Sequence, residues 1–437
     1  MANYNFKNIS AGIFRSAVAS VDPYRLVSAH AGEIRNAFLE GGFRRLVMVG
    51  FGKASCPMVR ALEDSLSDID YSGAIITKYG HCRGHELRKV SVHEAGHPLP
   101  DEAGVRGAQE VISLLRDADE HSLVVCLISG GGSALLVCPY EGVTLSDKQR
   151  MTDLLLKAGA DIHDLNTVRK HISMVKGGRL AGLAYPAEVK SLIISDVIGD
   201  DLGVIASGPT SPDGTTFGDA LNVIAKYELE KKSPASVIAL LKKGADGALP
   251  ETPKTGHHLF ERVTNLIIGN NTKALKAARD AAEALGIEAQ IVSSELKGEA
   301  KEAAKWLAEK ALEIRLAPKS QGPVCLVSGG ETTVTVKGSG LGGRNTEFAL
   351  AFALEIEGAD GITLLSAGTD GTDGPTDAAG AVADARTVSN ARVSGLDPLA
   401  YLKDNDSYNF FRKSDDLFVT GPTGTNVADI QIVIIAR

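Results

Sequence analysis

Short apolar runs alternate with longer amphipathic segments along most of this chain. Runs rich in β-branched residues occupy positions 46–49, 73–77, 123–128, 191–195, 263–268 and 324–327. Such runs are typical of buried strands, and the segments between them have helical periodicity. We therefore expect an α/β fold in which the first domain is Rossmann-like, with a mostly parallel sheet and helices on both faces.

The pattern is interrupted between residues 241 and 258. This segment contains Lys-Lys-Gly, Gly-Ala-Asp-Gly, two prolines and Gly256, a cluster that ends regular structure. Because 437 residues exceed what one hydrophobic core commonly supports, two domains are expected, with the active site in the cleft between them. We predict domains at 1–255 and 256–437; the pattern leaves residues 1–40 unassigned, with packing on the second domain as the alternative.

Composition and charge narrow the class of protein. The formal net charge of −8 argues against a general nucleic-acid-binding surface, so an anionic substrate requires a local basic pocket. The five cysteines include no Cys-x-x-Cys pair, and we expect buried, reduced thiols. The N-terminal residues do not resemble a secretion signal, and no run of about 18 apolar residues occurs, so we expect a cytoplasmic protein outside the membrane.

The first candidate for chemistry is Gly-Phe-Gly-Lys-Ala-Ser at 50–55, between a predicted strand and a predicted helix at 58–66. Free backbone N–H groups at a helix start can bind an anion. Gly52 and Lys53 are therefore candidate phosphate-contacting residues. The alternative is a solvated lysine, although a cation at this end of a helix is unfavourable without an anion beside it.

Two better-known nucleotide motifs fit this turn poorly. A dinucleotide fingerprint is disfavoured because Ser55 replaces the third glycine and Lys78 stands where a ribose-binding acid is expected. A P-loop is excluded because its first glycine is missing ahead of Lys53, and Ala54 stands where a serine or threonine should follow the lysine.

A second glycine turn follows the run at 123–128 and consists of Ser129, Gly130, Gly131, Gly132 and Ser133. Three glycines free the backbone N–H groups to form a concave anion-binding nest, with a hydroxyl group at each end. The alternative is a merely flexible turn. We predict that this turn binds phosphate or substrate.

Basic residues also recur at helical spacing. Arg169, Ser173 and Lys176 stand at i, i+4 and i+7, which predicts one helix face presenting two cations and a hydroxyl. Asn166 is a candidate N-cap, and the glycines at 177–178 are a candidate stop. Although such a face is often merely solvated, we predict that Arg169 and Lys176 bind phosphate or substrate.

The second half of the chain contributes one further cation. Arg344 follows two glycines and opens the predicted helix at 348–354. Arginine suits phosphate binding because its planar group stays charged and donates to two oxygens at once. We expect Arg344 to face Lys53 across the cleft, the alternative being a plain surface arginine.

Two acidic loops are candidates for Mg²⁺, at 195–201 and 369–377. We single out Asp196, Asp370 and Asp373 as candidate metal ligands. The second loop departs from the spacing of a calcium-binding loop, and its alternative role is in Asp-Gly turns.

His-Glu-Ala-Gly-His at 93–97 matches the zinc-protease motif literally. That motif requires both histidines on one face of a helix, whereas a strand-like run precedes it and Gly96, Pro98 and Pro100 oppose a helix. We reject zinc binding and predict a loop that lines the substrate site.

Several motifs together resemble those of one known family, the glycerate 2-kinases with a C-terminal MOFRL domain. In order along the chain, the matching segments are 50–55, 96–101, 129–133, 176–179, 207–210, 328–332, 342–345 and 420–426. The resemblance covers nearly the whole chain.

What the resemblance implies is an ATP-dependent, Mg²⁺-assisted kinase that phosphorylates the 2-hydroxyl of D-glycerate to give 2-phosphoglycerate. Lys53 and Arg344 match the family's catalytic pair, and the matching Gly-Gly-Arg-Asn segment makes Asn345 a candidate binding residue. The C-terminal domain is then of the MOFRL type.

Two rival functions stay open at this point. One is an NAD(P)H-dependent hydroxypyruvate reductase, a name often given to relatives, and the other is a non-catalytic sensor of a sugar acid or nucleotide. Whether the chain forms a homo-oligomer, and which anion the turn at 129–133 holds, are also open.

Overall fold

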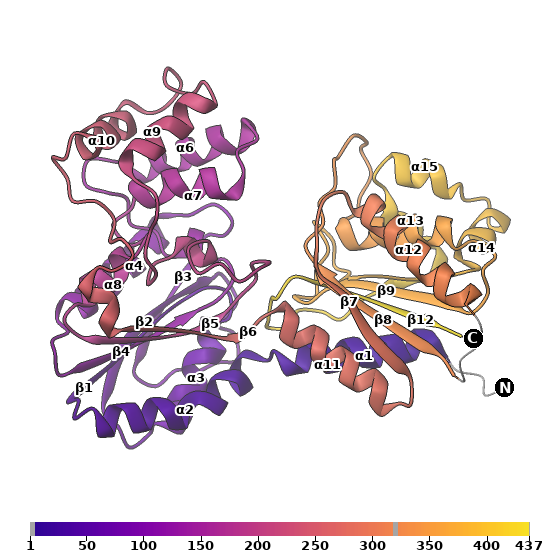
Figure 1. The fold of residues 1–437 in the computed structure, drawn as a ribbon, viewed down its shortest axis with the longest axis horizontal. Helices are drawn as coiled ribbons and strands as arrows, with labels where there is room; N and C mark the ends of the chain where they lie inside the picture. Colours follow the sequence, from indigo (N-terminus) through magenta and orange to yellow (C-terminus); the bar gives the residue numbers. More distant parts are fainter. Residues whose placement is uncertain (1–4, 318–321, 437) are drawn as a thin grey trace. The chain divides into compact units, whose positions relative to one another are not determined.

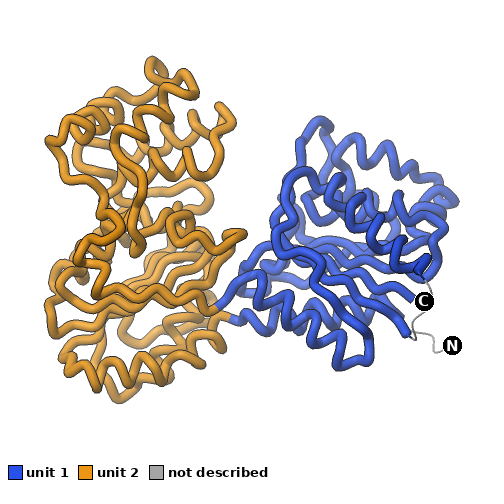
Figure 2. Tube along the Cα trace, viewed as in Figure 1, with its two compact units in different colours: residues 1–22, 269–437 blue, residues 23–268 orange. Residues whose placement is uncertain are grey.

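The computed structural model describes residues 5–317 and 322–436. They form two compact units, each with its own sheet (Figure 2). Unit 2 is residues 23–268, and unit 1 is made of the described residues among 1–22 and 269–437. The two-domain α/β organisation is thus confirmed; the boundary predicted at residue 255 lies inside unit 2, in the loop before the 3₁₀ helix η2 (His258–Arg262).

Unit 2 is built on a six-stranded sheet in the order β3-β2-β1-β4-β5-β6. The pairings from β3 through β5 are parallel, and this order is that of the Rossmann fold. The predicted strand positions are confirmed. The strands are β1 (Arg45–Phe51), β2 (Tyr71–Lys78), β3 (Val90–Ala95), β4 (Ser122–Ile128), β5 (Glu188–Ile194) and β6 (Val263–Gly269).

Helices cover both faces of this sheet (Figure 1). On one face lie α2 (Pro23–Glu40) and α3 (Ser55–Ser65), and on the other lie α4 (Glu102–Arg116) and α8 (Arg179–Ala184). Val111 and Leu115 of α4 pack with Val47 and Val49 of β1 in one apolar cluster. Covering on both faces explains why β1 and β4 are continuous apolar runs rather than alternating ones.

Four more helices of unit 2 form a small bundle with its own core (Figure 1). They are α6 (Leu145–Lys157), α7 (Ile162–His171), α9 (Phe217–Lys226) and α10 (Ala235–Ala245). Two are fixed at their starts by capping boxes, in which Thr144 and Thr216 each accept from the backbone three residues on.

Unit 1 has a mixed sheet in the order β11-β10-β9-β12-β8-β7. Only β7 and β8 are parallel among its described pairings. Its strands are β7 (Glu288–Leu296), β8 (Val324–Gly330), β9 (Ile362–Gly368), β10 (Gly380–Asp384), β11 (Leu417–Phe418) and β12 (Asp429–Ile435).

The helices of unit 1 also lie on two faces of its sheet, with α12 and α13 on one and α1 and α11 on the other (Figure 1). These are α1 (Phe6–Ser20), α11 (Asn271–Ala284), α12 (Ala300–Leu316) and α13 (Arg344–Glu355), with α14 (Thr387–Val393), α15 (Pro398–Lys403) and α16 (Ser407–Ser414) completing the unit.

The first helix belongs to the unit that the end of the chain completes. Phe14 of α1 stacks edge-on against Phe418, with 5.3 Å between ring centroids. The hydroxyl of Thr425 donates to the Val21 carbonyl at 2.8 Å. The chain therefore crosses between the units twice, at residues 22–23 and again at 268–269.

One cysteine prediction was wrong. Cys56 and Cys82 form a disulfide with their Cα atoms 5.5 Å apart, although 26 residues separate them. Cys56 lies in α3 and Cys82 in the loop after β2, so only the fold brings them together, and their spacing carries no signal. Cys126 and Cys325 are free and buried as predicted.

Among the described residues, no helix combines the length and apolar character needed to span a bilayer.

Candidate active site

The candidate site begins where β1 and β4 end. Phe51 pairs with Ile128, so the two strands finish level with one another. From β1 the chain continues to β2 on one side, while β4 leads to β5 on the other, which makes this the switch point of the sheet. Ligands of open α/β sheets bind in the crevice at the carboxyl ends of the strands at such a point. Both predicted glycine turns leave from these ends.

The two glycine turns are hydrogen-bonded to each other. The Lys53 N–H donates to the Gly130 carbonyl at 2.8 Å, and the Ala54 N–H donates to Ser129 Oγ at 3.0 Å. Gly52 has φ +129°, and a Cβ there would lie 2.2 Å from Ser129 Oγ. Only glycine permits this approach. The structure therefore brings together the turns that the sequence predicted separately.

Two other loops approach the turn at 129–133 closely, because its glycines have no side chains. A Cβ at Gly130 would lie 2.3 Å from Asp196 Oδ2, and one at Gly131 would lie 3.0 Å from the His97 ring. Asp196 follows β5, and His97 follows β3. A candidate metal ligand and a histidine thus reach the same turn.

The surroundings of Lys53 are electropositive. Burial, together with the charges of Lys53, Lys78 and His81, lowers the pKa of His97 to about 4. Burial also lowers the pKa of His81, whose Nδ1 lies 3.3 Å from the Lys53 carbonyl. Both imidazoles are therefore neutral at pH 7, and they can share hydrogen bonds with a ligand without adding charge.

The far end of the second glycine turn is held by a serine pair. Ser133 Oγ lies 2.8 Å from Ser207 Oγ, which donates to Asn166 Oδ1 at 2.9 Å. Ala206 and Ser207 have φ of +50° and +65°, a conformation that costs free energy and tends to occur at functional sites. A Cβ at Gly132 would lie 2.9 Å from the Ala206 side chain, so this turn and the strained segment are closely packed.

The helix predicted to carry Arg169, Ser173 and Lys176 on one face was wrong in its bounds. α7 begins at Ile162, with Asp161 as its N-cap, and ends at His171. Asn166 is therefore within the helix rather than its cap, and residues 173 and 176 lie beyond its end. The glycines at 177–178 have positive φ, and they precede α8 instead of ending α7.

Arg169 and Lys176 nevertheless come together, through the fold rather than through helical spacing. Burial lowers the pKa of Lys176 well below its usual range, and the charges of Arg169 and Lys148 lower it further. Lys148 was missed by sequence reasoning. The sequence did carry a signal for it. Lys148 stands three and seven residues before buried Met151 and Leu155, so helical periodicity puts it on the apolar face of α6.

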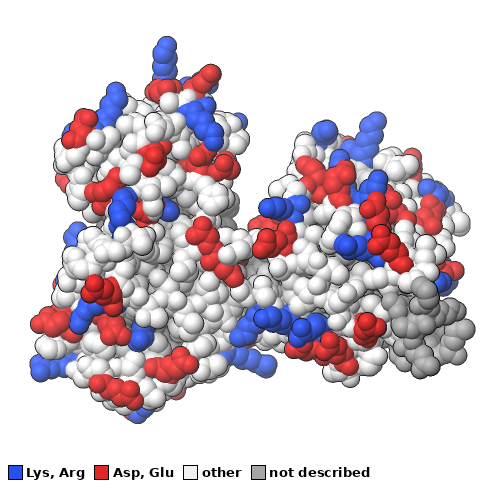
Figure 3. All heavy atoms as spheres, viewed as in Figure 1, with Lys and Arg blue, Asp and Glu red and all other residues white. Residues whose placement is uncertain are grey.

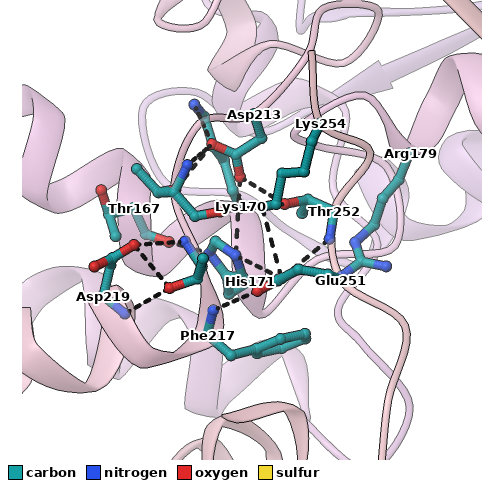
Figure 4. A network of polar contacts seen from close by, with 12 residues as sticks. Thr167, Lys170, His171, Arg179, Asp213, Phe217, Asp219, Glu251, Thr252 and Lys254 are labelled. Carbon is teal, nitrogen blue, oxygen red and sulfur yellow. Dashed lines mark hydrogen bonds and ion pairs between the residues drawn. The ribbon is translucent and has the colours of Figure 1, made fainter. Parts of the chain in front are cut away.

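Lys170 and His171, which follow Arg169 on α7, belong to a different network that contains carboxylates (Figure 4). Lys170 Nζ lies 3.2 Å from Asp213 Oδ1, and His171 Nε2 lies 3.1 Å from Glu251 Oε1. The hydroxyl of Thr252 donates to Asp213 at 3.0 Å. These contacts join α7 to the loops at 213 and 251–252, and they give each of these buried basic groups a carboxylate.

In unit 1, Arg344 begins α13, which confirms its predicted position at the opening of a helix. Its Nε and Nη2 donate to both oxygens of buried Asp429 at 2.5 and 2.9 Å, and its Nη1 lies 2.9 Å from Glu331. Burial alone would lower the pKa of Arg344, but these two carboxylates outweigh burial and raise it. Arg344 is thus a permanently charged, oriented guanidinium.

Asp373 and Asn345 fix the start of the same helix. Asp373 accepts from the backbone N–H of Asn345 and Thr346 at 2.9 and 2.8 Å. The Asn345 amide oxygen accepts from Ser366 at 2.8 Å. Burial raises the pKa of Asp373. Both predicted site residues therefore have a structural task at the N-terminus of α13.

The predicted Mg²⁺ ligands come from both units. Asp196 lies in unit 2, whereas Asp370 lies in unit 1, where its carboxylate accepts from the Thr372 backbone at 3.0 Å. Among residues 5–317 and 322–436, no three His, Cys, Asp or Glu side chains are arranged to hold a metal ion.

The zinc-motif look-alike is not helical. His93 and Glu94 lie on β3, and His97 follows it. The side chain of His93 contacts Glu110 at 2.6 Å. The loop predicted for residues 93–97 is therefore shorter than expected. Residues 93–95 belong to β3, which pairs with β2 as far as Ala95, and the loop begins after it.

Known proteins resemble this chain over its full length. Residues 10–242 match a domain of unknown function, DUF4147, and residues 324–429 match the MOFRL family. The D-glycerate 2-kinase of Thermotoga maritima is 42% identical over 432 residues, which are 99% of this chain and 99% of the relative. This chain belongs to the glycerate 2-kinase family. The resemblance noted from the motifs is thereby confirmed.

Other members of the glycerate 2-kinase family agree in sequence and fold. The glycerate 2-kinase of Pyrococcus horikoshii is 42% identical over 100% of this chain and 98% of its own. The crystal structure of the T. maritima glycerate kinase aligns with a TM-score of 0.87 over 98% of this chain and 99% of that one, at 42% identity. A relative in Agrobacterium vitis, 42% identical over 97% of this chain and 93% of its own, is named provisionally as a hydroxypyruvate reductase.

Proposed function

We propose that this chain is an ATP-dependent kinase that phosphorylates the 2-hydroxyl of D-glycerate, giving 2-phosphoglycerate and ADP. One observation carries the proposal. The joined glycine turns place Lys53 at the switch point of a Rossmann-type sheet, in a chain matched over 99% of its length by a D-glycerate 2-kinase.

Phosphoryl transfer asks for positioning and positive charge more than for covalent help. The 2-hydroxyl oxygen bonds to the γ-phosphorus, the bond from that phosphorus to the β,γ-bridging oxygen breaks so that ADP leaves, and the hydroxyl proton passes to solvent water. In this proposal Lys53 and Arg344 neutralise the charge on the transferring oxygens. Arg344 uses at most three of its five N–H donors on Asp429 and Glu331, so donors remain for a phosphoryl group.

Mg²⁺ is part of the proposal, and Asp196 is the residue that fits it best. Magnesium in such enzymes is held by one or two carboxylates together with substrate phosphates and water. Asp196 Oδ2 lies against Gly130, within the glycine turn that is proposed to bind an anion. Asp370 is the alternative in unit 1, while the hydrogen bonds of Asp373 to α13 leave it least suited.

The reductase alternative conflicts with the geometry of a dinucleotide site. In Rossmann enzymes an acidic residue near the end of the second strand binds the ribose, whereas β2 ends at Lys78. The third glycine is also missing, since Ser55 stands at the start of α3.

A direct assay tests the proposal. Purified protein is incubated with D-glycerate, ATP and Mg²⁺, and the phosphoglycerate isomer is identified, beside a parallel assay with hydroxypyruvate and NADH or NADPH. We expect ATP-dependent 2-phosphoglycerate. Oxidation of the nicotinamide without phosphorylation would overturn the kinase proposal.

A further inference from the structure

Three basic side chains meet inside unit 2 without a carboxylate. Lys148 comes from α6, Arg169 from α7 and Lys176 from the segment after α7. The side chains of Lys148 and Lys176 are buried, with 3% and 0% of their residue surface exposed. Within the described part of the chain, none of the three makes an ion pair, in contrast to Lys170 one residue along the helix. This differs from the surface drawn in Figure 3, where Lys and Arg are interspersed with Asp and Glu.

Two buried donors here point at no acceptor. The Nζ of Lys148 and the Nδ2 of Asn166 have no hydrogen-bond partner, and Asn166 is only 2% exposed. Asn166 and Arg169 stand three residues apart on α7 and so share a face. Leaving a buried amine or amide unpaired costs free energy unless a ligand supplies the acceptor.

We propose that Lys148, Arg169 and Lys176, with the amide of Asn166, bind an oxyanion of a small molecule. The occupant is a carboxylate or phosphate group, and only its assignment to D-glycerate or to ATP rests on the proposed function. Ser207 connects this oxyanion pocket to the glycine turn at 129–133, because its hydroxyl contacts both Ser133 and Asn166.

The electrostatics of this basic cluster favour an anion. Burial, together with the charge of Arg169, lowers the pKa of Lys148 to about 7. Burial likewise lowers the pKa of Arg169 to about 10. A bound anion would offset the mutual repulsion and favour the charged form of each side chain.

Lys176 also has a structural contact, so it is not the residue to test. Its Nζ donates to the Ala206 carbonyl at 3.2 Å and so helps to hold the strained segment at 206–207. Lys148 Nζ makes no such bond. Lys148→Met removes its charge while keeping much of its bulk.

The first experiment is thermal unfolding of the full chain at constant ionic strength. Inorganic phosphate, ADP and D-glycerate are added separately to the wild type, Lys148→Met and the control Lys157→Met. Lys157 lies on the same helix but is exposed and paired with Asp153 at 2.8 Å. We expect at least one anion to raise the Tm of the wild type and the control, and to raise that of Lys148→Met much less.

A second variant keeps the test decisive if Lys148→Met does not fold. Asn166→Asp preserves the oxygen that accepts from Ser207 and supplies the basic groups with an internal carboxylate. We expect a higher Tm without added anion and no further rise with one. Equal anion-induced shifts in the wild type, Lys148→Met and Asn166→Asp would overturn the proposal, as would no shift in the wild type with any of the three anions.

Steady-state kinetics identify the source of the anion. A charge-assisted hydrogen bond accounts for about 10- to 100-fold in affinity. Lys148→Met is expected to raise the KM for D-glycerate by that factor if the pocket holds the carboxylate, or the KM for ATP if it holds a phosphate. Unchanged values for both would contradict the proposal. If no kinase activity is found, the unfolding experiment still tests the pocket, so the two failures are distinguishable.

Discussion

At the scale of single residues, position in the fold decides what a charge can do. Lys53 lies in the glycine turn that follows β1, at the switch point of the sheet. Lys148 lies on α6 and is enclosed beside other basic groups. Sequence motifs predicted the first because its turn has a recognisable pattern. Lys148 could be recognised only from the structure, because the basic residues beside it come from α7 and from the segment after α7.

Lys53→Met tests the proposed charge at the reacting phosphate. Removing one preorganised donor from such a site lowers kcat by about 10²- to 10³-fold, and we expect a loss of that size with little change in Tm. The control is Lys89→Met, whose lysine is exposed and paired with Asp70 at 2.6 Å. Near-normal turnover in Lys53→Met would remove this residue from the mechanism.

The oxyanion pocket predicts a pH-dependent affinity. Lys148 faces Arg169 on α7, Lys176 after α7 and Cys138 in the loop before α6. Burial keeps the Cys138 thiol neutral by raising its pKa. With a pKa lowered to about 7 from 10.5, Lys148 is charged below pH 7 and neutral above it. Anion binding above pH 7 must therefore take up a proton.

Sulfate is a suitable probe because its charge does not change in this range. We expect its affinity, measured by calorimetry, to be highest below pH 7 and to fall by up to about tenfold per pH unit above it. Lys148→Met should reduce this slope, and Lys176, whose pKa is also lowered by burial, accounts for the slope that remains. A flat profile in the wild type would show that Lys148 does not titrate with binding.

At the scale of elements, the predicted apolar runs all became strands, whereas most strands of unit 1 and the neighbours of each strand in its sheet were not predicted. Seven-residue runs such as 122–128 are entirely buried, so their apolar composition marks them directly. The order of strands in the sheet depends on helix packing across the chain and is not written in any one segment. The Cys56–Cys82 disulfide and the end of α7 at His171 failed to be predicted for the same reason.

Gly52→Ala would disrupt the close approach of the two glycine turns. Its Cβ would lie 2.2 Å from Ser129 Oγ and 2.4 Å from the Ser129 carbonyl oxygen. We expect a loss of about 3 kcal/mol or more in the free energy of unfolding, measured with denaturant.

The matched control is Gly142→Ala. Gly142 also has positive φ but has open space around its missing side chain, so it should lose only about 1–2 kcal/mol from backbone strain. Similar losses for both variants would mean that the contact between the turns carries little free energy.

At the scale of the whole molecule, unit 2 is a continuous segment with two apolar cores of its own. We expect residues 23–268 expressed alone to fold and to unfold cooperatively, because domains with separate cores are independently stable. Circular dichroism and a denaturant titration would test this. A segment without a cooperative transition would show that unit 2 needs unit 1 for stability.

Unit 1 differs because both ends of the described chain contribute to it. Its α1 comes first in the sequence, and β12, at 429–435, pairs with β8 on one side and β9 on the other. During synthesis on the ribosome, residues 23–268 can fold as soon as they emerge, whereas α1 and β8 must wait, partly uncovered, until the final strand arrives. Premature termination before residue 429 would therefore leave an opened sheet with two unpaired edges, a substrate for proteases and chaperones rather than a shortened enzyme.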